Sequence, residues 1–263
     1  MDEPTIKQHI FLSPHLDDAA LSCGGSIHTQ CQRGQAVQVI TVFAGSPTEA
    51  SPSDYAEELR RRWGGATDPV AERRREDRLA MAHLGASFKH WELCDCVYRL
   101  DPATNRALYA TEESIFGAVH PLERAWHIEL AERLAEEMPV TAARFYAPLS
   151  VGHHVDHQIV HRAARRLFEQ GFPVLFYEDF PYAGDQQAVE QALTQCGAGA
   201  WQMRVVHLCI ADLDAKCRSI AAYRSQISTF WQDDDEMRQF VREQTQNAKG
   251  RLAERYWQLS DPC

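Results

Sequence analysis

The chain has 263 residues, a length that suits one large domain. Hydrophobic residues make up 44% of it and charged residues 24%, an ordinary globular balance that excludes a disordered or fibrous protein. The formal net charge of −10 is the wrong sign for a protein held to nucleic-acid phosphates, so we expect no nucleic-acid partner. No stretch approaches the roughly 20 apolar residues that cross a bilayer, and the acidic start does not resemble a signal peptide. We therefore expect a cytoplasmic protein without membrane insertion.

Short apolar runs alternate with longer amphipathic ones along the chain, a pattern typical of β-α-β units and a mainly parallel sheet. The expected strands, in chain order, cover residues 10–12, 36–43, 89–93, 143–149, 174–177 and 203–210. The expected helices cover residues 19–32, 70–84, 122–137, 157–170 and 186–194, and the chain from residue 212 onward is mostly helical in pattern. The sequence therefore predicts an α/β fold.

Two segments, residues 44–69 and 97–120, break this alternation and have no clear period. Long irregular segments in compact domains are usually functional loops or insertions. No repeat or linker divides the chain, so we expect a single domain over residues 1–263 with loop insertions near these two segments. Since both follow strands on one edge of the sheet, we expect them to wall a substrate cleft. Trp63, Tyr98 and Tyr109 offer flat faces for a sugar there.

The most informative stretch is SPHLDDAALSCGG, residues 13–25, which follows the first strand and opens the first helix. In an open α/β sheet, ligands bind beyond the carboxyl ends of the strands. His15 and Asp18 are three residues apart, so a tight turn can bring them to one centre, and an imidazole with a carboxylate suits Zn²⁺. Asp17 lies between them and stays free beside the metal. The plainer alternative is that Asp17 or Asp18 only caps the helix.

A second polar cluster, GHHVDH at residues 152–157, follows the strand that ends near residue 149. It lies at a strand-to-helix junction, at the same edge of the sheet as His15. The alternative is a polar loop in which Asp156 caps the next helix. Together the two motifs supply three ligands and leave one coordination position open, which indicates a catalytic rather than a structural metal site.

These two motifs resemble those of the PIG-L/LmbE-like de-N-acetylases, a family that includes N-acetylglucosaminylphosphatidylinositol deacetylase. Further segments resemble the branch that deacetylates teicoplanin-type glycopeptides: TVFAG (41–45), RRRED (73–77), LCD (93–95) and YEDFPY (177–182). The resemblance covers most of residues 8–230. It implies a Rossmann-like fold and a zinc-dependent amide hydrolase that removes acetyl groups from N-acetylated amino sugars.

The resemblance also implies a role for individual residues. His15, Asp18 and His157 match the metal ligands, with one Zn²⁺ per chain, although Fe²⁺ or another divalent ion also suits such ligands. Asp17 matches the general base. His154 matches the histidine that faces the substrate carbonyl and, if protonated, stabilises the oxyanion. Asp156 matches the residue that orients His154.

Other positions depart from the family pattern or are less specific. Leu16 and Ala19 stand where the wider family usually has Pro and Glu, which removes neither a ligand nor the base. Arg73 and Asp95 match positions that could grip sugar hydroxyls, although an arginine on a charged helix often only pairs with neighbouring acids. We expect a small-molecule or glycoconjugate substrate.

Two other classes of function stay open from the residues alone. A metallo-phosphoesterase also uses Asp and His, but its two-metal centre needs more ligands than the two motifs provide. A non-catalytic sugar- or nucleotide-binding domain would suit an alternating β/α pattern, but the first turn lacks G-x-G-x-x-G. Gly24 and Gly25 come inside the expected helix rather than before it.

Overall fold

A computed structural model describes residues 6–47, 53–63, 68–137, 143–195, 200–246 and 250–260 of the chain. Its strands are β1 (Gln8–Ser13), β2 (Ala36–Thr41), β3 (Ser87–His90), β4 (Ala143–Pro148), β5 (Val174–Tyr177), β6 (Trp201–His207) and β7 (Ala253–Leu259). Its longer helices are α1 (Asp18–Gln32), α2 (Asp54–Arg62), α3 (Pro69–Leu84), α5 (Trp126–Glu137), α6 (Val155–Glu169), α7 (Gln186–Gln195), α8 (Ile210–Ala221) and α10 (Asp234–Thr245). The shorter ones are α4 (Glu112–Ile115), α9 (Arg224–Phe230) and the 3₁₀ turns η1 (Cys96–Tyr98), η2 (Pro121–Glu123) and η3 (Tyr182–Gly184).

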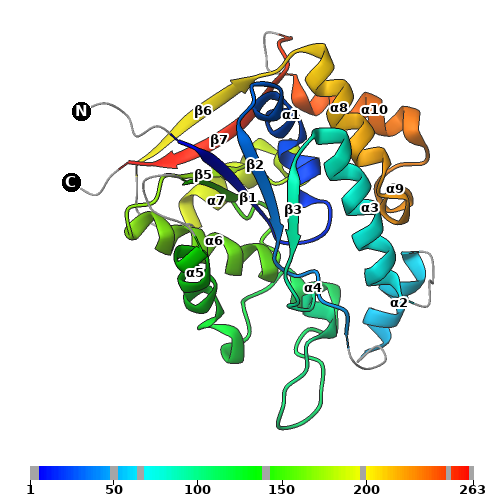
Figure 1. The fold of residues 1–263 in the computed structure, drawn as a ribbon. Helices are drawn as coiled ribbons and strands as arrows, with labels where there is room; N and C mark the ends of the chain where they lie inside the picture. The colour runs from blue at the N-terminus through cyan, green and yellow to red at the C-terminus, as the bar shows by residue number, and fades with distance from the viewer. Residues whose placement is uncertain are drawn as a thin grey trace.

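The described strands form a seven-stranded sheet in the order β3-β2-β1-β4-β5-β7-β6 (Figure 1). The first five pair in parallel, whereas β7 pairs antiparallel with both β5 and β6. The chain therefore has the predicted α/β fold with a mainly parallel sheet. The strand order reverses direction between β1 and β4, and such a switch point is where an open α/β sheet binds its ligand.

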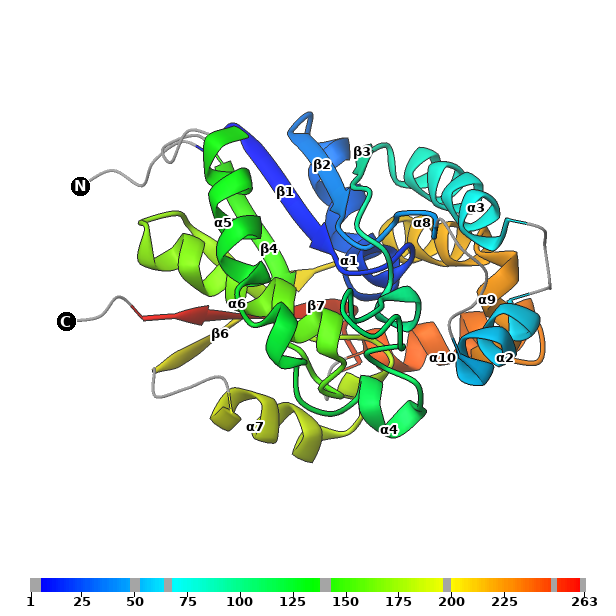
Figure 2. The same cartoon turned by 90° about the horizontal axis from the view of Figure 1, so that it is seen from below.

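Helices cover both faces of the sheet, as Figure 2 shows, and the alternation of side chains along β1 explains why. Ile10 and Leu12 face a core that includes residues of α5 and α6, whereas Phe11 faces a second core with residues of α1, α3 and α8. All three side chains are 0% exposed. A strand buried on both faces has to be apolar on both, as the run Ile10-Phe11-Leu12 is.

Local sequence signals define where α3 begins and ends. The Asp68 side chain accepts a hydrogen bond from the Ala71 N–H, and Pro69 occupies the first turn, where no N–H is needed. Gly85 ends the helix with a φ of 77°, a left-handed conformation that glycine adopts without strain. Within the described residues, no helix is long and apolar enough to cross a membrane.

Several expected elements differ from the observed ones. The expected strand at 89–93 is β3 at 87–90, and the one expected at 203–210 is β6 at 201–207. The expectation of a mostly helical end was incomplete, since β7 follows α10 and inserts between β5 and β6. The segment 44–69 contains α2, with residues 48–52 and 64–67 lying outside the described residues. The segment 97–120 contains part of η1 and all of α4.

Candidate active site and metal centre

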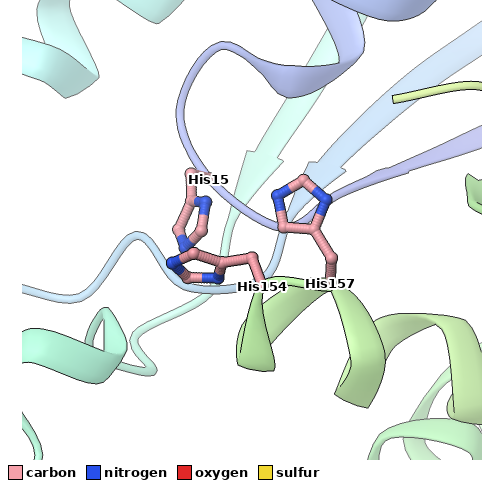
Figure 3. Close-up of side chains that lie close together, drawn as sticks. All are labelled: His15, His154 and His157. Carbon is pink, nitrogen blue, oxygen red and sulfur yellow. The ribbon is translucent and has the colours of Figure 1, made fainter. Parts of the chain in front are cut away.

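The residues singled out from the sequence meet at the carboxyl edge of the sheet. His15 follows β1, Asp95 follows β3, and His154 and His157 follow β4. The three histidines offer nitrogen atoms that lie within 4.8 Å of one another (Figure 3). They border a cavity of about 220 Å³ that Asp17, Asp18, Arg73 and Asp95 also line. The sequence motifs therefore converge, as expected, on one concave site at the switch point between β1 and β4.

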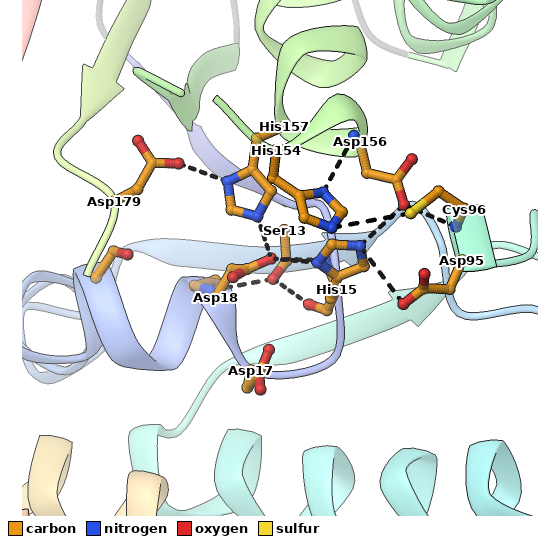
Figure 4. Close-up of polar contacts among 12 residues, drawn as sticks. Ser13, His15, Asp17, Asp18, Asp95, Cys96, His154, Asp156, His157 and Asp179 are labelled. Carbon is orange, nitrogen blue, oxygen red and sulfur yellow. Dashed lines mark hydrogen bonds and ion pairs between the residues drawn. The ribbon is translucent and has the colours of Figure 1, made fainter. Parts of the chain in front are cut away.

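Ser13 determines the geometry of the first motif. Its hydroxyl donates to the His15 carbonyl at 2.6 Å and accepts the Ala19 N–H at 3.0 Å, so it serves the first turn of α1 (Figure 4). Asp17 stands at the N-cap position, yet within the described residues its side chain makes no capping hydrogen bond. The helix-capping alternative therefore does not account for Asp17, whose carboxylate lines the cavity instead.

Hydrogen bonds fix which nitrogen of His15 is free. Its Nε2 lies 2.9 Å from Oδ2 of Asp156 and 3.7 Å from Oδ2 of Asp95, so Nε2 carries the proton. Nδ1 is the nitrogen that faces Asp18, whose Oδ2 lies 3.3 Å away. Burial opposes a charge on this imidazole, but the carboxylates of Asp95, Asp156 and Asp18 raise the pKa of His15 well above its usual value.

His157 is oriented in the same way by Asp179, which follows β5. Nδ1 of His157 donates to Oδ1 of Asp179 at 2.5 Å, and Asp179 is 1% exposed. The other nitrogen, Nε2, lies 3.3 Å from Oδ2 of Asp18. Burial works against the charge, but Asp18 and Asp179 raise the pKa of His157 to about 10. A carboxylate behind a histidine is the usual partner of a metal-binding imidazole.

Asp18 is the point where the two imidazoles meet. Its Oδ2 lies 3.3 Å from both Nδ1 of His15 and Nε2 of His157. Two ligands held at 2.0–2.1 Å in a tetrahedron are about 3.3 Å apart, so these two contacts match two edges of such a site. Burial disfavours a charge on Asp18, but the two histidines lower its pKa well below the usual value. Two nitrogens and one carboxylate form a ligand set that suits Zn²⁺.

His154 differs from the other two histidines because its Nδ1 caps helix α6. Nδ1 accepts the backbone N–H of Asp156 at 3.3 Å, so the neutral ring carries its proton on Nε2. Burial and the neighbouring His15 lower the pKa of His154 to about 3. Both effects disfavour a charged ring, and a neutral imidazole held in this way offers an Nε2–H donor.

The contacts of Asp156 also differ from the expectation. Its carboxylate was expected to orient His154, but it accepts hydrogen bonds from His15, from the Cys96 N–H at 3.1 Å and from Arg99. The hydrogen bond between Asp156 and His154 runs from the backbone N–H of Asp156 to Nδ1 of the ring. Although burial opposes its charge, Arg99 and His15 hold the pKa of Asp156 below the usual range. Asp156 is therefore placed to orient His15.

Asp17 lies beside the proposed ligands in contact with Arg73. Its Oδ2 is 3.6 Å from a guanidinium nitrogen of Arg73, which stacks on the Trp63 ring at 4.8 Å. Burial raises the pKa of Asp17 to about 7, and Arg73 acts in the opposite direction. A carboxylate with a pKa near neutrality is suited to take up and return a proton.

The walls of the cavity come in part from the two irregular segments. Trp63 lines it as expected, whereas Tyr98 and Tyr109 are buried core residues, so the expectation that they face a sugar was wrong. Other aromatic side chains that the sequence interpretation did not assign to the site take that place: Tyr55, Phe116, Tyr182 and Phe230.

Asp179 is a further residue of the site to which the sequence analysis assigned no role, although it lies in the YEDFPY segment. The signal that could have found it is its position directly after a buried strand that neighbours β4.

The chain belongs to the PIG-L family, because the family model described as "PIG-L: GlcNAc-PI de-N-acetylase" matches residues 10–168. Two proteins named 2′-N-acetylparomamine deacetylase are similar to it. The one from Niallia circulans is 29% identical over 188 residues, which is 67% of this chain and 68% of that protein. The one from Streptomyces fradiae is 36% identical over 186 residues, which is 69% of this chain and 60% of that protein.

Solved structures of glycopeptide deacetylases are similar over nearly the whole chain. The zinc-inhibited form of teicoplanin deacetylase Orf2 has a TM-score of 0.78 and 27% identity, and the match covers 97% of this chain and 100% of that one. The A40926 pseudoaglycone deacetylase Dbv21 has a TM-score of 0.74 and 26% identity, with 98% of each chain covered. These findings confirm the expected family and branch. They also confirm the expected reaction class, removal of an N-acetyl group from an amino sugar, over the two alternatives.

Proposed function

We propose that the chain hydrolyses the acetamide of an N-acetylglucosamine-type sugar in a small glycoconjugate, with one Zn²⁺ ion per chain. The observation that carries this proposal is the convergence of His15 and His157 on Asp18, with Asp17 lining the cavity beside them and not part of that set. The N-deacetylase relatives supply the reaction class, and the geometry supplies the roles below.

His15, Asp18 and His157 would hold the metal, each histidine through the nitrogen that its outer carboxylate leaves free. A divalent ion bound there makes water more acidic and polarises an amide carbonyl. The donor set fits it because five carboxylates lie in or beside this site: Asp17, Asp18, Asp95, Asp156 and Asp179. Without a cation, protons on His15 and His157 balance part of that negative charge.

Asp17 and His154 carry the proton transfers and the charge stabilisation. Asp17 takes a proton from the attacking water and returns it to the departing amine, as its pKa of about 7 allows. His154 donates its Nε2–H to the carbonyl oxygen as negative charge develops there. A neutral donor suffices for this role, and its orientation is preset because its Nδ1 is held by the N-terminus of α6.

The cavity also suggests how much of the substrate it encloses. At about 220 Å³ it is smaller than the roughly 300–1,000 Å³ of sites for drug-sized ligands. We infer that it holds the acetylated sugar, while the rest of the conjugate lies against the aromatic rim. Arg73 and Asp95 line the cavity and would bind sugar hydroxyls. The aminoglycoside and glycopeptide precursors of the relatives define the substrates to try first.

The test is acetate release from a panel of N-acetylglucosamine conjugates, with metal content measured on the same preparation. The decisive variant is Asp17→Asn, which should keep its metal and lose about 10²–10⁴-fold in turnover because an amide cannot accept the proton. Wild-type rates in the metal-loaded variant would refute the base assignment. Absence of acetate release from every conjugate by the metal-loaded wild type would refute the proposed activity.

A further inference from the structure

A second cavity lies between α6 and α7, behind the loop that leads into α6. Its volume is about 260 Å³, and its lining includes Ser150, His153, His161, Arg162 and Arg165, with Gln195 on the α7 side. Among the described residues, none lines both this cavity and the candidate active site. The two sites nevertheless share a loop, because His153 borders the second cavity and the next residue, His154, borders the first. We call it the α6/α7 cavity.

The charge of this cavity is positive. Arg162 and Arg165 line it, and none of its described lining residues is an Asp or Glu, although the whole chain has a formal charge of −10. Arg162 contacts Gln158 at 3.3 Å and is otherwise exposed on the helix surface. The exposed guanidinium of Arg162 provides planar donors for an oxyanion, and Arg165, one helical turn further along α6, adds positive charge.

Two buried polar atoms of the lining have no hydrogen-bond partner within the part of the chain that the structure describes. They are Oγ of Ser150 and Nε2 of His161, on residues that are 7% and 4% exposed. Leaving such groups unpaired is unfavourable, so buried polar atoms of this kind usually meet water or a ligand. Both atoms therefore mark this cavity as a place where a polar molecule binds.

The hydrogen bond at Nδ1 of His161 determines that a ligand at Nε2 must be a hydrogen-bond donor. Nδ1 of His161 donates to the Pro148 carbonyl at 2.9 Å, so Nε2 presents a lone pair. Burial, with Arg165 and Arg162 nearby, lowers the pKa of His161 to about 4 and keeps the ring neutral. An anion without a hydrogen atom could satisfy the arginines but would face this lone pair unfavourably. A ligand that satisfies both needs an oxyanion and an O–H group.

We propose that the α6/α7 cavity binds a phosphate-class anion that carries an O–H group, either inorganic phosphate or a hydroxyl-bearing phosphate ester. The oxyanion lies against Arg162 and Arg165, its O–H donates to Nε2 of His161, and the Ser150 hydroxyl donates to a remaining oxygen. Sulfate has the same shape and, near neutral pH, no O–H. Preference for phosphate over sulfate is therefore the signature of the His161 lone pair.

The experiment is isothermal titration of the holoenzyme with inorganic phosphate, glycerol phosphate and sulfate. A catalytic metal can also bind phosphate, so the comparison between variants isolates the second cavity. Arg162→Gln removes an exposed guanidinium and should weaken phosphate binding at this site at least tenfold, as loss of a charged hydrogen bond does. The matched control is Arg166→Gln, on the same helix and outside the lining, which should bind as the wild type does.

His161→Phe tests the proposed donor requirement. This variant should bind phosphate and sulfate about equally, whereas the wild type should prefer phosphate about fivefold or more. Ser150→Ala is the second variant, since it changes the ligand contacts without touching the ring. It should weaken the binding of both anions.

The proposal would be overturned if Arg162→Gln bound phosphate as tightly as the wild type does. Equal affinity of the wild type for phosphate and sulfate would also overturn it. Comparing the affinities for inorganic phosphate and glycerol phosphate shows whether the cavity accepts the free anion, a phosphate ester or both.

Discussion

At the scale of single residues, the two proposed metal-binding imidazoles are oriented by carboxylates that are far from them in sequence. Asp156 lies 141 residues after His15, and Asp179 lies 22 residues after His157. Each carboxylate holds a ring proton on one nitrogen and so leaves the other nitrogen free for a cation. The ligand set therefore depends on two residues that are not ligands.

Asp179→Asn should weaken metal binding about 10–100-fold, the usual effect of losing an outer carboxylate. The Asp179 carboxylate accepts from His157 and from the Val151 N–H at 3.0 Å. An asparagine has one carbonyl oxygen and cannot accept both bonds in the same way. The measurement is competition for the metal against a chelator of known affinity.

The neighbouring residue gives the control for this change. Glu178 bonds to Arg255 and Trp257 at 2.7 and 3.0 Å, away from the histidines, so Glu178→Gln should keep the wild-type metal affinity. If both variants held the metal as tightly as the wild type, Asp179 would have no part in orienting His157.

The two site motifs could be predicted from the sequence because their members are close along the chain. PHLDD and HHVDH each follow a strand, and parallel strands bring such junctions to one edge. The partner of each carboxylate could not be predicted in the same way. Whether Asp156 orients His154 or His15 depends on how the loop after β3 packs, since the Cys96 N–H and Arg99 also hold that carboxylate.

At the scale of elements, α3 connects the active site to the C-terminal helices through buried acids. Glu76 is 2% exposed and accepts hydrogen bonds from the N–H and the hydroxyl of Ser225, at 2.8 and 2.6 Å. One turn earlier on α3, Arg73 contacts Asp17. Ser225 lies in α9, whose Gln226 and Phe230 line the cavity. The same helix thus positions a cavity arginine and holds part of the cavity wall.

Glu76→Gln should lower the free energy of unfolding by about 1–3 kcal/mol, because an amide cannot accept both bonds from Ser225 and leaves a buried donor unpaired. Glu72 is the matched control on the same helix. Within the described residues its side chain pairs with Arg75 at the surface, so Glu72→Gln should leave stability essentially unchanged. Urea denaturation of the two variants and the wild type measures the difference. Equal destabilisation by both substitutions would contradict the proposed role of Glu76.

The parallel part of the sheet could be predicted from the sequence, but the last strand could not. The runs at 10–12, 36–43 and 143–149 are apolar because their strands are buried on both faces. β7 reads AERYWQL, with polar and aromatic residues mixed, and Glu254 in it is buried. Its carboxylate pairs with Lys216 and accepts the Gly25 and Ser26 N–H groups of α1, so a tertiary contact accounts for a charge inside the protein. No local pattern predicts that contact.

At the scale of the whole molecule, buried neutral histidines make stability depend on pH. Burial lowers the pKa of His9 and of His161 to about 4 and that of His154 to about 3, against 6.5 for an unfolded histidine. The unfolded chain therefore binds more protons than the folded one between about pH 6.5 and 4. Stability that these groups contribute is fully present above pH 6.5 and is lost as the pH falls towards 4.

His9 allows this effect to be measured away from the metal site. It lies at the start of the central strand β1, is 4% exposed, and its Nδ1 is 2.9 Å from the Tyr146 hydroxyl. Burial and Arg144 both disfavour its charged form.

His9→Asn removes this titrating group. It also removes packing and the hydrogen bond to Tyr146, so we expect the variant to be less stable than the wild type at pH 7. Acidification should then destabilise the wild type more than the variant. The gap in unfolding free energy should shrink by roughly 1–3 kcal/mol between pH 7 and 4, because the pKa of His9 is about 4 in the folded protein and about 6.5 in the unfolded chain. Urea denaturation of both proteins at several pH values measures it, and the titrations of His154, His161 and the metal ligands cancel in the difference. A gap that stays constant across this range would mean that His9 titrates in the folded protein as it does in the unfolded chain.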